Sequence, residues 1–124
     1  MSSLRSLVIL GASDKPDRAS NLLIRRALLR GGYDVVPVNP ALESIAGVPV
    51  RSRVDDVPPH PDVISVYLSA ERSAALEQDI ARLAPAKVIF NPGAENPALE
   101  SRLNAAGIET ENACSLVLLG QGQL

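Results

Sequence analysis

Short apolar runs alternate with longer amphipathic stretches along the chain, and this alternation constrains the fold more than any other feature. A run that is apolar at almost every position is typical of an interior strand in a parallel sheet, because helices cover both faces of such a sheet. We therefore predict strands at residues 7–10, 33–38, 48–50, 63–68, 87–90 and 107–110.

The amphipathic stretches predict helices over residues 19–29, 70–83 and 97–106. Residues 41–61 hold four prolines and predict one short helix or turn together with one short edge strand. Strands and helices in alternation imply right-handed crossovers. The predicted fold is α/β: a doubly wound, Rossmann-like sheet of five or six mainly parallel strands, with central order 3-2-1-4-5 and a ligand crevice between strands one and four.

Composition narrows the class of protein further. The 124 residues suit one domain spanning 1–124, and a net charge of −2 without a basic cluster argues against a nucleic-acid partner. A single cysteine excludes an internal disulfide framework and suits a reducing compartment. No run approaches the ~18 apolar residues of a membrane span. The sequence therefore predicts a soluble, cytoplasmic protein with no membrane partner.

The loop after the first predicted strand has the features of an anion site. Gly11 follows the strand directly and permits a tight turn with close backbone approach to a ligand. The helix that begins near residue 19 offers unpaired N–H groups and the positive end of its dipole. Ser13, Lys15 and Arg18 add a hydroxyl and two positive charges. The pattern predicts a phosphate-bearing ligand at this end of the sheet.

The same loop departs from two familiar nucleotide motifs. Gly-x-Gly-x-x-Gly would need glycines where Ser13 and Pro16 stand, and no Gly-Lys-Ser/Thr of a P-loop follows. The second predicted strand ends in Asn39-Pro40, where NAD-binding proteins usually carry an acidic residue. From these residues alone, Gly11 either belongs to an anion site or merely ends a strand, with Ser20 capping the helix. A small NAD(P)-linked oxidoreductase or redox sensor, and an interaction subunit with a vestigial nucleotide pocket, stay open as alternatives.

Several motifs occur in order over nearly the whole chain. They are Gly11-Ala12-Ser13 with Lys15, Pro16, Arg18 and Ser20, and the segments 32–40 (GYDVVPVNP), 47–50 (GVPV), 88–97 (VIFNPGAENP) and 113–119 (ACSLVLL). Together they resemble the small stand-alone CoA-binding proteins, which have a CoA-binding domain of the succinyl-CoA synthetase α-subunit type. The resemblance implies a Rossmann-like fold and CoA or an acyl-CoA as the bound cofactor.

The resemblance also implies roles for residues of the first loop. Gly11-Ala12-Ser13 would form the turn under the CoA diphosphate. Lys15 and Arg18 would meet the phosphates, including the 3′-phosphate that distinguishes CoA from NAD. Ser20 and Asn21 would lie at the start of the following helix.

Three further segments are implied on the other sides of the ligand. Asn39 and Pro40 would border the adenosine, and Leu68 and Ser69 would flank the ligand across the switch point. Asn91, Pro92 and Gly93 would shape the far wall, near the pantetheine arm. Residues 67–71 are nearly neutral, whereas many members of the family are more basic or glycine-rich there.

Other chemistry-bearing residues are few. Cys114 is either a small buried residue or a redox-active thiol near the pantetheine sulfur, able to form a mixed disulfide with CoA. His60 has no second histidine beside it, so neither a zinc site nor a Ser-His-acid triad is predicted. Without a catalytic constellation, the sequence favours a non-catalytic binding module over an enzyme. The apolar run 116–119 either packs on the domain as a strand or helical turn, or forms the interface of a homo-oligomer.

Overall fold

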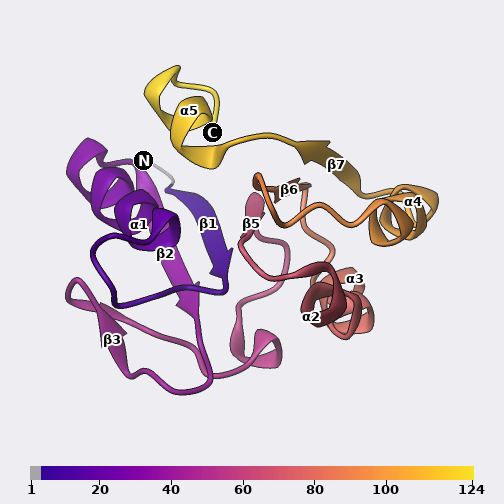
Figure 1. Ribbon diagram of the computed structural model, residues 1–124, viewed down its shortest axis with the longest axis horizontal. Coiled ribbons are helices and arrows are strands. Elements are labelled where there is room, and N and C mark those ends of the chain that lie inside the picture. The colour runs from indigo at the N-terminus through magenta and orange to yellow at the C-terminus, as the bar shows by residue number, and fades with distance from the viewer. Residues whose placement is uncertain (1–3) are drawn as a thin grey trace.

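A computed structural model describes residues 4–124, and five parallel strands form its central sheet (Figure 1). The order is β2-β1-β5-β6-β7, where β1 is Arg5–Leu10, β2 Tyr33–Val38, β5 Val63–Val66, β6 Lys87–Phe90 and β7 Glu109–Asn112. Leu10 pairs with Val38 on one side and with Val66 on the other. The strand order therefore reverses between β1 and β5, as predicted, and open α/β sheets bind their ligands at such a point.

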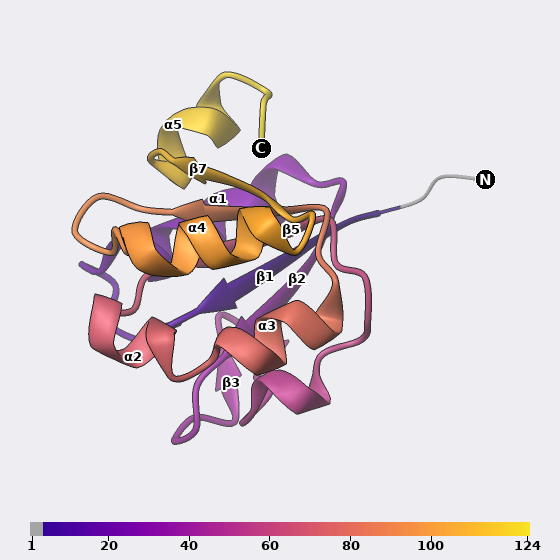
Figure 2. The same ribbon diagram turned by 90° about the vertical axis from the view of Figure 1, so that its right-hand side faces the viewer.

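Helices cover both faces of this sheet (Figures 1 and 2). On one face lie α1 (Ala19–Arg30) and α5 (Ser115–Gly120). On the other lie α2 (Ala70–Ala74), α3 (Glu77–Leu83) and α4 (Pro97–Ala105), with the short 3-10 helix η1 (Val54–Asp56) beside α3. In Figure 2 the second group stands in front of the strands and α1 behind them. The predicted doubly wound α/β fold is confirmed.

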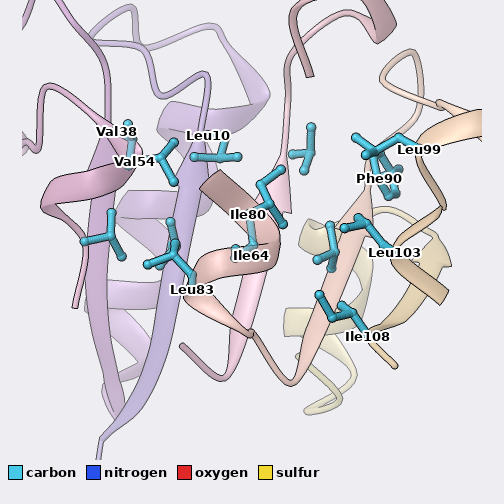
Figure 3. Close-up of a cluster of buried hydrophobic side chains, with 14 of the residues drawn as sticks. Leu10, Val38, Val54, Ile64, Ile80, Leu83, Phe90, Leu99, Leu103 and Ile108 are labelled. Atoms are coloured by element: carbon cyan, nitrogen blue, oxygen red, sulfur yellow. The ribbon is translucent and has the colours of Figure 1, made fainter. Parts of the chain in front are cut away.

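Alternation along the strands divides the core into two layers. Leu10 and Phe90 point to the α3/α4 face, where Ile80 and Leu103 meet them (Figure 3). Ile9 points to the opposite face, among the buried residues of α1. All of these side chains are at most 1% exposed, and each buried side chain of this size contributes about 1.5–3 kcal/mol relative to an exposed one. The sheet that carries the carboxyl-terminal strand ends is therefore rigidly supported from both sides.

The predicted third strand does not join the central sheet. β4 (Val48–Pro49) pairs instead with β3 (Ser44–Ile45) in a small antiparallel hairpin. Pro49 has no N–H group, so it is unsuited to a continuous parallel ladder. Only Arg51 bridges β2, where its N–H donates to Pro37 O at 2.9 Å and its carbonyl accepts from Asn39 N at 3.0 Å. This bridge carries the chain across the carboxyl end of β2.

The helix predicted over residues 70–83 is two helices, α2 and α3. Each part is held by a different neighbour, because Asn96 Nδ2 donates to Ala70 O and Ser73 Oγ of α2, both at 3.0 Å, whereas Ile80 anchors α3 in the core. The break leaves the exposed side of α2 facing the carboxyl ends of the strands.

The last predicted strand is displaced by two residues. Gly107 N donates to Asn104 O and Ile108 N to Leu103 O, so these residues close the turn after α4 and β7 begins at Glu109. Lys87 of β6 forms ion pairs with Glu109 and Glu111, and the bond to Glu111 raises the pKa of Lys87. β7 is thus a polar strand at the edge of the sheet.

The apolar run 116–119 is helical and belongs to α5. Leu119 is buried and its carbonyl accepts from Arg30 Nη1 of α1 at 2.7 Å, whereas Val117 is 55% exposed. Most of the run therefore packs within the chain, and self-association through its exposed part stays a prediction. Across residues 4–124, no helix is both long and apolar enough to span a membrane.

Candidate functional site

A cleft of about 770 Å³ opens at the carboxyl ends of β1, β2 and β5, a volume within the ~300–1,000 Å³ usual for small-molecule sites. Its walls come from the loop after β1, the start of α1, the chain after β2, the segment before η1, and the α2–α3 region. The residues predicted from the sequence that line it are Gly11, Ala12, Ser13, Lys15, Arg18, Ser20, Asn39, Pro40 and Leu68.

Gly11 sets the close approach of the loop to β5. Its φ is +82°, and a Cβ placed on it would lie 3.2 Å from the carbonyl carbon of Tyr67 and 3.0 Å from Cδ2 of Leu68. The Leu68 side chain is able to shift, but the backbone of Tyr67 is held by its own bond to Leu10 O at 2.9 Å. Only glycine fits this turn without strain.

We expect Gly11→Ala to destabilise the protein by about 2–3 kcal/mol, because the substitution combines a left-handed backbone with a contact against main-chain atoms. Gly120→Ala is the matched control: no atom lies near the added methyl group there, and the backbone is helical. Urea denaturation of both variants measures the difference. Equal midpoints for the two variants would show that the turn tolerates a side chain.

Asparagine side chains hold the rest of the loop in place. Asn21 Nδ2 donates to Ser13 O at 2.9 Å, and Asn39 Nδ2 donates to Ala12 O at 2.8 Å. Asn21 is itself buried, with its oxygen accepting from Arg25 Nε at 2.7 Å. It therefore supports the loop from behind and does not line the cleft. Asn39 both supports the loop and lines the cleft.

The amino-terminal end of α1 faces the cleft. Arg18 is the N-cap residue, its side chain forms no capping hydrogen bond, and Ser20 lies buried inside the first turn. In the part of the chain that the structure describes, the N–H groups of Ala19, Ser20 and Asn21 donate to no protein acceptor. Such free donors and the positive end of the helix dipole favour an anion.

The cations of the cleft differ in how they are paired. Arg53 Nη2 lies 3.0 Å from Asp55 Oδ2, and Asp55 also binds Arg82. Lys15 and Arg18 form none of the ion pairs found among residues 4–124, although Asp14 and Asp17 stand next to them in sequence. Two positive charges beside the free end of α1 are therefore available to a ligand.

A further group of cleft residues, not predicted from the sequence, comes from two segments far from the first loop. They are Ser52, Arg53, Val54, Asp55, Arg72, Ala75, Leu76 and Asp79, together with Tyr67. Two signals were present: a basic pair, Arg51 and Arg53, follows the short strand, and Arg72 lies in the first turn after the strand at the switch point. Both segments carry a cation to the cleft.

Five predicted residues do not line the cleft: besides Asn21, these are Ser69, Asn91, Pro92 and Gly93. Ser69 caps α2, with its Oγ accepting from Arg72 N at 3.3 Å. Pro92 and Gly93 are exposed after β6, and a contact with a pantetheine arm outside the cleft stays a prediction for them. Cys114 also lies outside the cleft and is half-buried before α5, so its proposed redox role stays a prediction.

Asn91 belongs to a buried polar cluster under α5. Its Nδ2 donates to Ser65 Oγ and Val66 O, both at 2.9 Å, and its Oδ1 accepts from Ser115 N at 2.8 Å. Ser65 Oγ and Ser115 Oγ are 2.7 Å apart, and all three polar side chains are at most 2% exposed. This cluster ties β5, the end of β6 and α5 together.

Tyr67 stands beside this cluster with a buried hydroxyl that has no hydrogen-bond partner among residues 4–124. Burial raises the pKa of Tyr67 to about 12. Ser65 and Ser115 lie near enough to lower that pKa slightly, although neither is in hydrogen-bonding geometry with the phenol. The phenol of Tyr67, which lines the cleft, is therefore protonated and neutral at physiological pH.

We expect Tyr67→Phe to leave stability at pH 7 unchanged or raise it by about 1 kcal/mol, because it removes an unpartnered buried hydroxyl. Because the folded-state pKa lies above the ordinary value of 10.0, ionisation of the phenol favours the unfolded chain. The stability of the wild type is therefore undiminished by this group below pH 10 and falls by at most about 2–3 kcal/mol as the pH rises from 10 to 12, a loss that phenylalanine does not show. Urea midpoints from pH 8 to 11.5 should fall less steeply in the variant. Parallel curves would contradict this assignment.

A metal centre finds no support in the described part of the chain, where no group of three or more His, Cys, Asp or Glu side chains is placed to hold an ion. His60 is exposed in a turn, with φ of 60°, and its N–H donates to Leu83 O at 2.7 Å. The cleft itself contains no histidine or cysteine.

Comparison with known proteins relates this chain to a family. The uncharacterized protein YneT of Bacillus subtilis (strain 168) is 27% identical over 75 residues, and the match covers 60% of this chain and only 55% of YneT. The crystal structure of another uncharacterized protein is 30% identical, with a TM-score of 0.89 over 98% of this chain and 99% of that one. The dinucleotide-forming acetyl-coenzyme A synthetase 1 of Ca. Korarchaeum cryptofilum, in complex with phosphate and ADP, shares the fold at 21% identity, with a TM-score of 0.74 over 88% of this chain and 25% of the enzyme.

The chain also matches a sequence family. The sequence profile of the CoA binding domain matches residues 5–120, which include every strand of the central sheet and every segment that lines the cleft. This chain therefore belongs to the CoA-binding domain family.

Proposed function

We propose that the protein binds CoA or an acyl-CoA in this cleft without converting it chemically. The diphosphate lies on the Gly11-Ala12-Ser13 turn, where the free N–H groups of the first turn of α1 meet it. Lys15 and Arg18 supply positive charge at the same place. The observation that carries the proposal is that both cations line the cleft beside a free helix end and form no ion pair among residues 4–124.

The charge of the cleft supports CoA over a plain dinucleotide. Lys15, Arg18 and Arg72 are its cations without an ion pair among residues 4–124. The diphosphate of NAD carries two negative charges, whereas the 3′-phosphate of CoA adds about −1.5 to −2 at pH 7. Three cations and a helix end match the larger charge better. The polar end of β2 at Asn39 also lacks the carboxylate that commonly binds the ribose of NAD.

The chemistry of the cleft supports binding over catalysis. Its carboxylates, Asp55 and Asp79, are engaged by Arg82, and the phenol of Tyr67 is held neutral. No base, thiol or imidazole within the described cleft is placed to activate a nucleophile. These features favour a carrier or sensor of the ligand.

Calorimetric titration of the purified protein with CoA, acetyl-CoA, dephospho-CoA, NAD and NADP tests this proposal. We expect CoA and acetyl-CoA to bind more tightly than dephospho-CoA, and NAD to bind most weakly. Preferred binding of NAD or NADP would support the oxidoreductase or redox-sensor alternative. An absence of binding by any of the five would support an interaction subunit with a vestigial pocket. Turnover of acetyl-CoA during the titration would contradict the non-catalytic part.

A further inference from the structure

Besides the Gly11 turn and the start of α1, the cleft is lined by Ser52–Asp55 and by the α2–α3 segment, and it does not reach Asn91–Gly93. Val54, Leu68 and Leu76 give the part between these two segments apolar walls. With the diphosphate at α1, this part suits the rigid, partly apolar nucleoside.

Two cations border this nucleoside part of the cleft, Arg53 and Arg72. Arg53 is paired with Asp55. The side chain of Arg72 takes part in no ion pair and no hydrogen bond among residues 4–124, while its backbone N–H donates to Ser69 Oγ. Arg53 would have to give up its ion pair with Asp55 in order to bind a phosphate. Arg72 has no such ion pair to give up. Arg72 is therefore better placed than Arg53 to bind an anion in the nucleoside part of the cleft.

The backbone of α2 at Arg72 is held in place by hydrogen bonds on the side away from the cleft. Ser73, its neighbour, is fully buried, and Asn96 is 6% exposed. Asn96 Nδ2 donates to Ser73 Oγ and to Ala70 O, both at 3.0 Å, while Asn96 Oδ1 caps α4 through Leu99 N at 3.2 Å. These bonds secure α2 to the scaffold on the side away from the cleft. The side chain of Arg72 thus projects from a supported helix rather than from a mobile loop.

From this placement we propose that Arg72 determines the specificity of the site for a nucleotide with a ribose 3′-phosphate. This inference rests on the proposed function. In this assignment Lys15 and Arg18 bind the diphosphate, which CoA, dephospho-CoA and NAD share. The 3′-phosphate, which the resemblance assigned to Lys15 and Arg18 together with the diphosphate, is bound by Arg72 instead, and among the three ligands only CoA carries it.

Titration of Arg72→Gln with CoA and with dephospho-CoA tests this assignment. We expect the Kd of CoA to rise about 10- to 150-fold, the effect of losing a charge-assisted contact, and the Kd of dephospho-CoA to change less than about twofold. Arg26→Gln is the matched control, because Arg26 is an exposed arginine on α1 outside the cleft. Arg72→Lys should keep part of the preference for CoA over dephospho-CoA, since lysine carries the charge but not the bidentate hydrogen-bonding geometry of arginine.

The outcomes separate this inference from the proposed function. Equal losses for CoA and dephospho-CoA would place Arg72 on the diphosphate and overturn its role in specificity. A CoA preference that survives Arg72→Gln, or a wild-type protein that binds both ligands equally, would also overturn that role while leaving CoA binding intact. A wild-type protein that binds neither ligand would remove the proposed function itself.

Discussion

Replacing both Lys15 and Arg18 with alanine is expected to weaken CoA binding by about 100- to 20,000-fold. Each charge-assisted contact to a phosphate contributes about 1.5–3 kcal/mol, and every 1.4 kcal/mol is a factor of ten in Kd. Arg18→Ala alone should therefore weaken binding about 10- to 150-fold. Folding should hardly change, because both side chains are exposed and form no ion pair within residues 4–124. Calorimetry and urea denaturation measure the two quantities.

The loop supplies its own control. Asp14→Ala combined with Asp17→Ala changes two exposed charges of the opposite sign, and neither residue lines the cleft. This variant should bind CoA as well as the wild type or somewhat more tightly, because it removes negative charge near a phosphate. Unchanged affinity in a folded Lys15→Ala, Arg18→Ala protein would make the loop purely structural. The assignment of CoA would then rest on family membership alone.

The largest expected loss of stability comes from Asn91→Ala, at about 3–5 kcal/mol. The substitution leaves Ser115 N without a partner. It also removes the side-chain bonds to Val66 O and Ser65 Oγ, which keep the backbone N–H of residue 91 and Ser115 Oγ as partners, and each lost hydrogen bond costs about 0.5–1.5 kcal/mol. Each buried polar group left without a partner costs about 1–3 kcal/mol. A domain is stable by only about 5–15 kcal/mol, so the variant should be close to the limit of folding at 37 °C.

Asn112→Ala is the matched control, because Asn112 is exposed on β7 and should change stability by less than about 0.5 kcal/mol. Urea denaturation at 15 °C keeps both variants folded at the start. A loss below about 1 kcal/mol for Asn91→Ala would show that the cluster is bonded differently from the arrangement described. The folded variant should still bind CoA, since Asn91 lies outside the cleft.

The strands and the tight turn at Gly11 were predictable because their signals are local. A continuous apolar run implies burial on two faces, and Gly11 between a strand and a helix implies a turn at the sheet end. The break between α2 and α3 was not predictable, because it depends on Asn96, which bonds to α2 from more than twenty residues further along the chain. Local periodicity carries no information about such a partner.

The residues of the candidate site also divide into those with a local sequence signal and those whose position depends on distant parts of the chain. Asn91 follows a strand, as a ligand residue would, but alternation along β6 places it on the α5 face, away from the cleft. Arg53 and Arg72 enter the cleft only because Arg51 bridges β2 and α2 is anchored beside β5. Which residues line the cleft depends on how the helices pack on the two faces of the sheet. A single sequence does not display it.

The polar strand β7 affects how copies of this protein meet one another. An outer strand presents unpaired backbone N–H and C=O groups, which are a template for joining sheets from separate molecules. A second β7 laid alongside would bring Glu109 and Glu111 close to the same carboxylates of its neighbour, and like charges in facing positions are destabilising. Lys87 already binds both glutamates of its own chain and is not free to neutralise the glutamates of a second molecule. Pairing of two sheets along β7 is therefore opposed by charge repulsion, which protects this edge of the protein from edge-to-edge aggregation.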